Sequence, residues 1–428
     1  MSPLFNPKSI AVIGASRNRE KVGNILLRNL VGPKCRGFKG DIYPINPNAR
    51  RILGKACYPS VGAVGKEIDL GLIATKAEAI PEILEGAKNL RSCIIISSGF
   101  SEVGNNALRD SLMAAARKNN IRVLGPNCIG LQVPAAGFNA TFMRPALKGE
   151  YAIISQSGAF CSSIIDWSVD NMVGFSKIIS IGNAYDVSFP ELIDYLQKDR
   201  STRKILIYVE GMARGREFME AARRSKKPIY ALKVGKTPEG KKAAKTHTGA
   251  MAGTYEIYKD VFRQVGVTEI MTIKDFFMFL KMSRMARKEA IVLTNAGGPG
   301  TATADLLCHE KIRLKKLAPS TMEKLGKILP KNWSRSNPVD ILGDATPERY
   351  EQALKILSKE DANIIVVLTP QEMTDPKETA RRILGYKNVV AVFIGGEETD
   401  RAREILSKKH VPAFEFSEQA VRCLGLLR

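Results

Sequence analysis

The sequence has few histidines, few tryptophans and no paired-cysteine motif. Three histidines and two tryptophans occur in 428 residues, and none of the seven cysteines belongs to a C-x-x-C pair. An odd number of cysteines without such pairs argues against a structural zinc site and against a disulfide framework. It is typical of proteins from a reducing compartment. We therefore expect no metal site in this chain.

Long apolar runs are also missing. The apolar stretches, such as 93–97 and 363–368, have the length of strands and are too short to span a bilayer. The N-terminus, Met1-Ser-Pro-Leu-Phe5, has no basic region followed by an apolar run, so we expect no secretory signal. These absences predict a cytoplasmic protein without a membrane partner.

Acidic residues are in the minority. The chain has 65 lysines and arginines against 43 aspartates and glutamates, a formal net charge of +22 and a pI near 9.7. This balance favours anionic ligands. The basic residues are spread along the whole chain, without a basic tail, interleaved aromatics or a nucleic-acid recognition motif. Phosphorylated small molecules or an acidic protein partner are therefore expected rather than a nucleic acid.

What is present is a regular alternation of short apolar runs with helical segments. Such alternation predicts α/β domains with parallel sheets covered by helices. We expect a first domain at 1–131, a linker rich in alanine, glycine and proline at 132–150, and two doubly wound domains at 151–287 and 288–428. In such sheets ligands bind beyond the carboxyl ends of the strands.

The first of these ends carries a small-residue turn, Gly14-Ala15-Ser16, after the apolar run 10–13. Such a turn lets a phosphate approach the backbone at a helix N-terminus, and Lys21 adds charge nearby. A dinucleotide site would need an acidic residue at the end of the second strand, where this chain has Asn46-Pro-Asn48. The missing acidic residue argues against NAD as the ligand. Another phosphorylated nucleotide, such as coenzyme A, is the expected ligand instead.

A second turn of this kind, Ser155-Gln156-Ser157-Gly158, stands between an apolar run and a helical segment. Hydroxyls and a glycine at a helix start predict an anion site. The alternative is a nucleophile elbow for acyl transfer. It requires G-x-S-x-G, whereas Ala152-Ile-Ile precedes the first serine here.

His247 is the most informative of the three histidines. It lies between Thr246 and Thr248, with lysines just before it. Hydroxyl donors and positive charge around an imidazole suit a phosphoryl group. Glu210, which follows the apolar run 205–209, could orient the ring. Cys128 has no charged or histidine neighbour in sequence, so we expect a packed side chain.

Eight motifs in order resemble one family. They are Ile13-Gly-Ala-Ser16, Tyr43-Pro-Ile-Asn-Pro47, Ser98-Gly-Phe-Ser-Glu102, Gly125-Pro-Asn-Cys-Ile-Gly130, Ser155-Gln-Ser-Gly-Ala159, Gly182-Asn183, Tyr208-Val-Glu-Gly211 and Thr246-His-Thr-Gly249. Together they resemble the α subunit of the nucleoside-diphosphate-forming acyl-CoA synthetases, typified by ADP-forming acetyl-CoA synthetase and related to succinyl-CoA synthetase. The resemblance implies an N-terminal Rossmann-like CoA-binding domain followed by two flavodoxin-like domains. The chain departs from the family at Lys76, commonly a proline, and at Lys245, usually a small residue.

The implied reaction converts an acyl-CoA, ADP and phosphate reversibly into the free acid, CoA and ATP, through an acyl phosphate and a phosphohistidine. By resemblance, His247 carries the phosphoryl group and Glu210 holds the histidine. The implied phosphate-binding residues are Ser155, Gln156, Ser157 and Gly158. The implied CoA-binding residues are Gly14, Ala15, Ser16, Lys21, Asn46, Ser98, Gly99, Phe100 and Asn127, the last facing the thioester.

The sequence contains neither a recognisable ATP-grasp domain nor a Walker A motif. The resemblance therefore implies a separate ATP-grasp β subunit that holds ADP or ATP and Mg²⁺, in an α2β2 assembly. A non-catalytic CoA-binding or regulatory protein on the same scaffold is the main alternative, and an NAD(P) oxidoreductase is another. The organic acid and the choice between ADP and GDP stay open.

Overall fold

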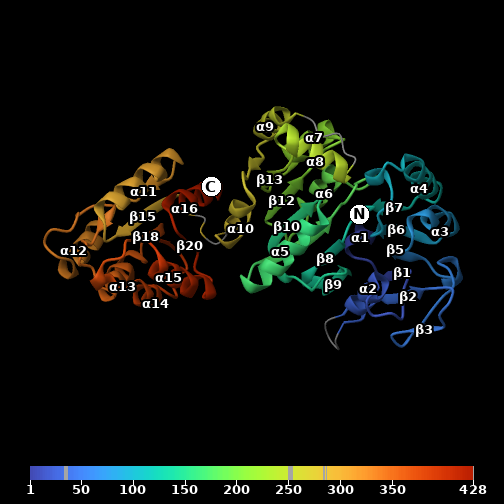
Figure 1. The fold of residues 1–428 in the computed structure, drawn as a ribbon, viewed down its shortest axis with the longest axis horizontal. Coiled ribbons are helices and arrows are strands. Elements are labelled where there is room, and N and C mark those ends of the chain that lie inside the picture. Colours follow the sequence, from blue (N-terminus) through green and yellow to red (C-terminus); the bar gives the residue numbers. More distant parts are fainter. Residues whose placement is uncertain (33–36, 249–253, 283–284, 286, 428) are drawn as a thin grey trace. The chain divides into compact units, whose positions relative to one another are not determined.

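The computed structural model describes residues 1–32, 37–248, 254–282, 285 and 287–427, and of residues 244–248 it describes the backbone alone. The chain forms two compact units, Met1–Met271 and Thr272–Arg428. In each unit strands form the interior and helices flank them (Figure 1). None of the described helices has both the length and the apolar character needed to cross a membrane.

The first unit begins with a five-stranded parallel sheet of order β2-β1-β5-β6-β7. Its strands are β1 (Ser9–Ile13), β2 (Asp41–Ile45), β5 (Ile68–Ile73), β6 (Leu90–Ile95) and β7 (Arg122–Leu124). The main helices are α2 (Val22–Val31), α3 (Ile80–Gly86) and α4 (Asn106–Lys118). The apolar run 10–13 lies in β1, and the run 93–97 overlaps the end of β6. β1 is buried along its whole length, as expected for a central strand of a sheet that is covered on both faces.

The second domain of this unit is a seven-stranded sheet of order β14-β13-β12-β10-β11-β8-β9. Its parallel strands are β10 (Leu147–Ser155), β11 (Gly174–Ser180), β12 (Lys204–Val209), β13 (Ile229–Lys233) and β14 (Thr268–Glu269). Its helices are α5 (Gly158–Asp170), α6 (Phe189–Leu196), α7 (Gly215–Arg224), α8 (Pro238–Thr248) and α9 (Tyr255–Gln264).

The predicted linker at 132–150 needs correction, because these residues belong to this second sheet. β8 (Gly130–Val133) pairs antiparallel with β11, and β9 (Phe138–Thr141) pairs antiparallel with β8. The alanine, glycine and proline content suggested a linker. However, Val133, Phe138 and Ala140 are buried in the core, so the segment is a hairpin that extends the sheet.

The second unit contains a parallel sheet of order β16-β15-β18-β19-β20, with β17 paired to β15. Its strands are β15 (Glu289–Thr294), β16 (Arg313–Leu314), β17 (Val339–Asp340), β18 (Asn363–Leu368), β19 (Val389–Phe393) and β20 (Ala413–Phe414). Its helices are α10 (Ile273–Lys281), α11 (Gly297–His309), α12 (Pro319–Ile328), α13 (Pro347–Leu357), α14 (Pro376–Arg382), α15 (Glu397–Lys408) and α16 (Ser417–Leu426). We expected α10 to close the second domain, but it packs against α16 and so belongs to the second unit.

One strand order underlies all three sheets. Leaving aside the two-residue β17, each sheet has five parallel strands. Numbered in chain order, these strands lie side by side in the order 2-1-3-4-5, which is the flavodoxin-like order. The first of them, β1, β10 or β15, is therefore the point where the order reverses. Ligands bind beyond the carboxyl end of the sheet at that point. The predicted fold class, a Rossmann-like domain followed by two flavodoxin-like domains, is confirmed.

Candidate functional site

Two of the predicted turns lie at these reversal points. Gly14–Ser16 follows β1 in the first domain, and Gln156–Gly158 follows β10 in the second. The second turn runs directly into α5, whereas residues 17–21 separate the first turn from α2. The two predicted turns therefore lie at the carboxyl ends of β1 and β10.

The turn after β1 is closely packed against its neighbours. Gly14 has a φ of +87°, and a Cβ on it would lie 2.5 Å from the carbonyl oxygen of Ala74, so only glycine fits there. The side chain of Asn46 donates a hydrogen bond of 2.7 Å to the carbonyl of Ala15. Lys21 is exposed at the N-cap of α2. Asn46 thus braces the turn, while Lys21 stays accessible to an anion.

A cavity of about 530 Å³ opens beside this turn. It is lined by Asn46, Pro47, Asn48, Ala49, Arg50, Cys57 and Pro59. The lining combines amide groups and one guanidinium at the end of β2, next to a turn that lets the backbone approach closely. This set of groups fits part of a phosphorylated nucleotide, and the predicted CoA residue Asn46 is one of the groups.

A third turn, at 97–102, contains three further predicted CoA residues. Ser98 is exposed, Gly99 has a φ of +117°, and Phe100 is fully buried, so its ring belongs to the core. One carboxylate oxygen of Glu102 accepts hydrogen bonds from the amides of Gly99 (2.5 Å) and Phe100 (3.1 Å). Glu102 therefore sets the shape of the turn, although we had not predicted it as a site residue.

Asn127 lies where the two domains of the first unit meet. Its φ is +56°, its amide donates to the carbonyl of Ser97 (2.9 Å), and its side chain contacts Asn183 (3.4 Å). The side-chain amide of Asn183 also donates to Glu102 over 2.6 Å. Burial alone would raise the pKa of Glu102, but hydrogen bonds from Gly99 and Asn183 outweigh it and hold that pKa below its ordinary value.

In the predicted phosphate turn, residues 155–158, both serine hydroxyls form hydrogen bonds with the backbone of the turn or of α5. Ser155 Oγ donates to the carbonyl of Ser157 (2.9 Å) and accepts from the Ser157 amide (3.1 Å). Ser157 Oγ accepts from the amide of Phe160 (3.2 Å) and so caps α5. The serines therefore shape the turn. An anion would be met by the backbone N–H groups of Gly158 and Ala159. The first N–H groups of a helix have no partner within it, and the next one, that of Phe160, is bonded to Ser157.

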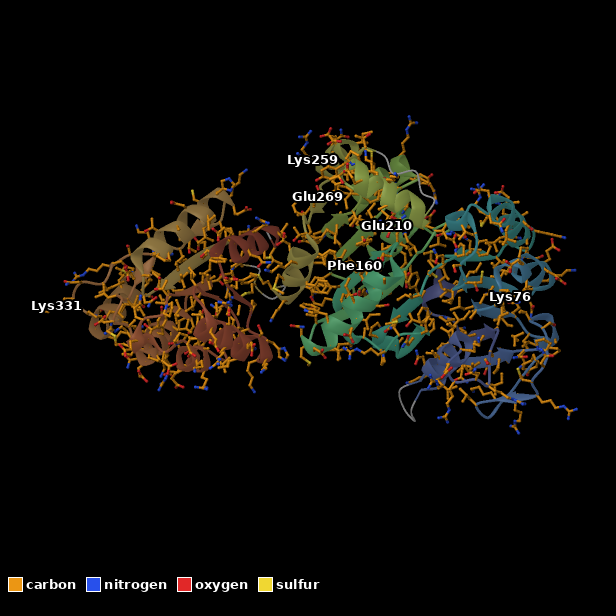
Figure 2. The ribbon with its side chains drawn as sticks, in the orientation of Figure 1. Lys76, Phe160, Glu210, Lys259, Glu269 and Lys331 are labelled. Atoms are coloured by element: carbon orange, nitrogen blue, oxygen red, sulfur yellow. The ribbon has the colours of Figure 1, made fainter. Side chains whose placement is uncertain are left out.

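Gln156 joins this turn to the predicted orienting carboxylate. Its Oε1 accepts hydrogen bonds from the backbone amides of Glu210 (2.6 Å) and Gly211 (3.0 Å). β12, which ends one residue before Glu210, pairs directly with β10. The structure thus brings the predicted phosphate turn and Glu210 together. Figure 2 labels Glu210 and Phe160 in the domain built on the seven-stranded sheet.

Lys233 is a site residue that we missed. It ends β13, only 1% of it is exposed, and its Nζ donates to the carbonyls of Glu210 (3.0 Å) and Val234. Burial lowers the pKa of Lys233 to about 8, although Glu210 acts in the opposite direction. The available signal was a lysine directly after the apolar run 229–232.

Two nearby groups have raised pKa values. Burial raises the pKa of Tyr208 to about 12, and Glu210 adds to this effect. Burial likewise raises the pKa of Cys128 to about 12, and its thiol contacts the carbonyl of Ile95. Both side chains are therefore neutral at physiological pH, which agrees with our expectation that Cys128 is a packed residue.

His247 belongs to α8, but its side chain lies outside the part of the chain that the structure describes. Its pairing with Glu210 therefore stays a prediction. The helix itself contacts the 3-10 turn η3 (Ser101–Val103), which follows the predicted CoA residues 98–100. Among the described residues, no group of histidine, cysteine, aspartate or glutamate side chains could hold a metal ion.

Three family models match the chain in succession. A CoA binding domain matches residues 8–134, a succinyl-CoA ligase like flavodoxin domain matches 148–283, and a ligase-CoA domain matches 290–427. The first covers the turns after β1, β2 and β6. The second covers the phosphate turn, Glu210, Lys233 and α8.

Curated relatives cover the chain almost completely. The ADP-forming acetate–CoA ligase I of Archaeoglobus fulgidus is 41% identical over 439 residues, which cover 100% of this chain and 63% of the relative. The ADP-forming acetate–CoA ligase II subunit alpha of Pyrococcus furiosus is 37% identical over 440 residues, which cover 97% of this chain and 94% of the relative. The chain thus spans less than two thirds of the Archaeoglobus protein and nearly all of the Pyrococcus subunit.

A solved structure is similar over the same extent. The dinucleotide-forming acetyl-coenzyme A synthetase 1 of Ca. Korarchaeum cryptofilum, in complex with phosphate and ADP, has a TM-score of 0.87 and 34% identity. The match covers 100% of this chain and 96% of that one. The chain therefore belongs to the family of ADP-forming acetyl-CoA synthetases.

Proposed function

We propose that the chain is the α subunit of an ADP-forming acid–CoA ligase. It would convert an acyl-CoA, ADP and phosphate reversibly into the free acid, CoA and ATP. The observation that carries the proposal is the pair of hydrogen bonds from the Glu210 and Gly211 amides to Gln156. They join an anion-binding turn to a carboxylate in a domain that also carries His247.

CoA would lie on the first domain. Gly14, Ala15, Ser16 and Lys21 would meet its phosphates, and Asn46 would face the cavity beside them. Ser98 and Gly99 form the accessible part of the next turn, whereas Phe100 would contribute through its position in the core. Asn127 would face the thioester from the junction of the two domains.

The chemistry would proceed in three steps. Phosphate, held by the first turn of α5, attacks the thioester carbonyl, and CoA leaves as the thiol while an acyl phosphate forms. His247 then attacks the phosphorus atom, and the free carboxylate leaves. Glu210 would hold the imidazole in position for this attack. The phosphohistidine finally passes its phosphoryl group to ADP.

The last step needs a nucleotide site. We infer a separate ATP-grasp partner that holds ADP, ATP and Mg²⁺, and an α2β2 assembly in the cytoplasm. Two kinds of relative support a partner. Pyrococcus relatives of similar length are named as subunit alpha, and the Archaeoglobus relative continues well beyond the matched region. An additional domain of the same protein would serve equally.

Radioactive phosphate tests the proposal. The chain and its ATP-grasp partner are mixed with an acyl-CoA and labelled phosphate, without ADP, and the protein is analysed for acid-labile label. We expect label on wild type and none on His247→Ala. His309→Ala is the matched control, because His309 is exposed on α11. An unlabelled wild type, tested over a panel of acyl-CoA esters, would support the non-catalytic alternative instead.

A further inference from the structure

A cluster of three side chains outside the site described above joins the two ends of the segment that carries His247. Glu269, on the edge strand β14, accepts hydrogen bonds from the hydroxyl of Tyr255 at 3.0 and 2.9 Å. The same carboxylate forms an ion pair of 2.7 Å with Lys236. Glu269 is labelled in Figure 2. We call Lys236, Tyr255 and Glu269 the anchor.

Two of the anchor residues, Lys236 and Tyr255, stand immediately outside the two ends of the segment 237–254. Lys236 precedes Thr237, whose hydroxyl accepts from the amide of Gly240 in the first turn of α8. Tyr255 follows Thr254, the N-cap of α9. One carboxylate on a strand therefore holds the residue before α8 and the first residue of α9.

Contacts between lysine ammonium groups and tyrosine rings also attach α9. The ammonium of Lys236 lies 4.9 Å from the centre of the Tyr255 ring, and that of Lys233 lies 4.7 Å from the centre of the Tyr258 ring. Tyr255 and Tyr258 are three positions apart on one helix, so they share a face. Two lysine–tyrosine contacts thus hold α9 against the end of β13.

The anchor is sheltered from solvent. The side chains of Lys236 and Glu269 are 22% and 13% exposed. Burial and the bond to Glu269 raise the pKa of Tyr255 to about 12, so this hydroxyl remains a donor. An exposed ion pair contributes little, whereas loss of one partner in a sheltered network leaves a charge uncompensated. Removal of Glu269 should therefore release both ends of the segment.

We propose that Glu269, through Lys236 and Tyr255, is a positioning residue that fixes both ends of the segment carrying His247. This inference rests on the proposed function, because a phosphoryl carrier that serves two sites must move between them. Fixed ends limit the positions that His247 can reach and so raise its effective concentration at each site. In this proposal the anchor acts through the segment and not on the substrate.

Transfer rates in the complex with the ATP-grasp partner test this. The variants are Glu269→Ala, Glu269→Gln, which keeps an acceptor for Tyr255 but loses the ion pair, and Tyr255→Phe, which keeps the ion pair alone. Two single-turnover steps are followed with radioactive phosphate: labelling of His247 from acyl-CoA, and loss of label to added ADP. The control is Glu323→Gln, which breaks an ion pair of equal length, 2.7 Å, to Lys327 on the surface of α12.

We expect both transfer steps to slow by about tenfold or more in Glu269→Ala, the effect of losing charge-assisted hydrogen bonds. Glu269→Gln and Tyr255→Phe should fall between it and wild type. The KM values for CoA and phosphate should change little, which a general loss of folding would not produce. Hydrogen exchange should rise in peptides that begin α8 and α9 and stay unchanged in β12.

The outcomes separate this inference from the proposed function. A wild type without label overturns the proposed function and this inference together. A labelled wild type with unchanged transfer in Glu269→Ala overturns the inference alone. If Glu269→Ala raises the KM for CoA and slows transfer no more than Glu323→Gln does, Glu269 has no positioning role and the inference is also overturned.

Discussion

The side-chain amide of Asn183 donates a hydrogen bond of 2.6 Å to the carboxylate of Glu102, and this bond joins the two domains of the first unit. The other oxygen of Glu102 holds the amides of Gly99 and Phe100. The shape of a predicted CoA-binding turn in the first domain therefore depends on a residue that follows β11 in the second. A residue outside the CoA domain can thus influence CoA binding.

Asn183→Ala should raise the KM for CoA by about tenfold, because Glu102 loses a charge-assisted hydrogen bond and the turn at 97–102 loosens. The measurement is steady-state kinetics at varied CoA with the ATP-grasp partner. Asn171→Ala is the control, since the Asn171 amide donates only within the end of its own helix. An equal KM for CoA in both variants would show that the bond does not shape the site.

The same bond predicts a pH effect on stability. The pKa of Glu102 is lowered in the folded protein, so the ionised group stabilises the fold above its unfolded pKa. This contribution is lost as the pH falls through the folded pKa. Asn183→Ala should therefore reduce the free energy of unfolding at pH 7 more than at about pH 3. Chemical denaturation at the two pH values checks this, and an equal reduction at both would contradict it.

Gly158→Ala should disturb the phosphate turn. A Cβ at this position would lie 2.8 Å from Cγ2 of Ile129. Overpacking of this kind costs about 1–3 kcal/mol. The contact is with the end of a side chain, so Ile129→Ala in the same protein should relieve it. Chemical denaturation of both single variants and of the double variant gives the interaction free energy between positions 158 and 129. Strictly additive losses would mean that the two residues do not meet.

The sequence predicted the fold because the signals were local. Apolar runs such as 10–13 and 205–209 have the length and composition of buried strands, and the small-residue turn after 10–13 marks the carboxyl edge of a parallel sheet. The hairpin at 130–141 escaped prediction because Gly137 and its alanine neighbours hid four-residue strands whose burial depends on β11, far along the chain.

The missed site residues share a different cause. Glu102 lies inside the motif at 98–102, but its hydrogen-bond partner Asn183 is 81 positions away in the sequence. From the sequence alone, a lysine such as Lys233 is expected to be exposed to solvent. In the structure it is buried beside Glu210. Periodicity and motif spacing describe neighbours along the chain. Contacts between turns of different strands come from the sheet order, which the sequence did not specify.

Lys233→Met should change how stability depends on pH. The folded pKa of Lys233 is lowered to about 8, below its ordinary value, so the unfolded chain binds more protons above that pH. Wild-type stability should therefore gain about 2–3 kcal/mol relative to the variant between about pH 8 and 10.5. Urea denaturation across this range measures the gain. Lys233→Arg keeps a charge and should lack the gain as well. Parallel pH curves for wild type and Lys233→Met would refute the prediction.

Gln156 offers the sharpest test of the site, because its two plausible roles can be separated. Gln156→Leu removes the acceptor of the Glu210 and Gly211 amides. Each buried amide left without a partner costs about 1–3 kcal/mol. Glu210 should therefore shift, and kcat should fall at least tenfold. Gln156→Glu keeps an acceptor oxygen but adds a negative charge beside the first turn of α5. It should largely preserve kcat and raise the KM for phosphate, because the added charge repels the anion. Kinetics of acyl-CoA-dependent ATP synthesis at varied phosphate measure both values. If Gln156→Glu left the KM for phosphate unchanged, the anion site would not be at this turn; if Gln156→Leu left kcat unchanged, Glu210 would not depend on Gln156.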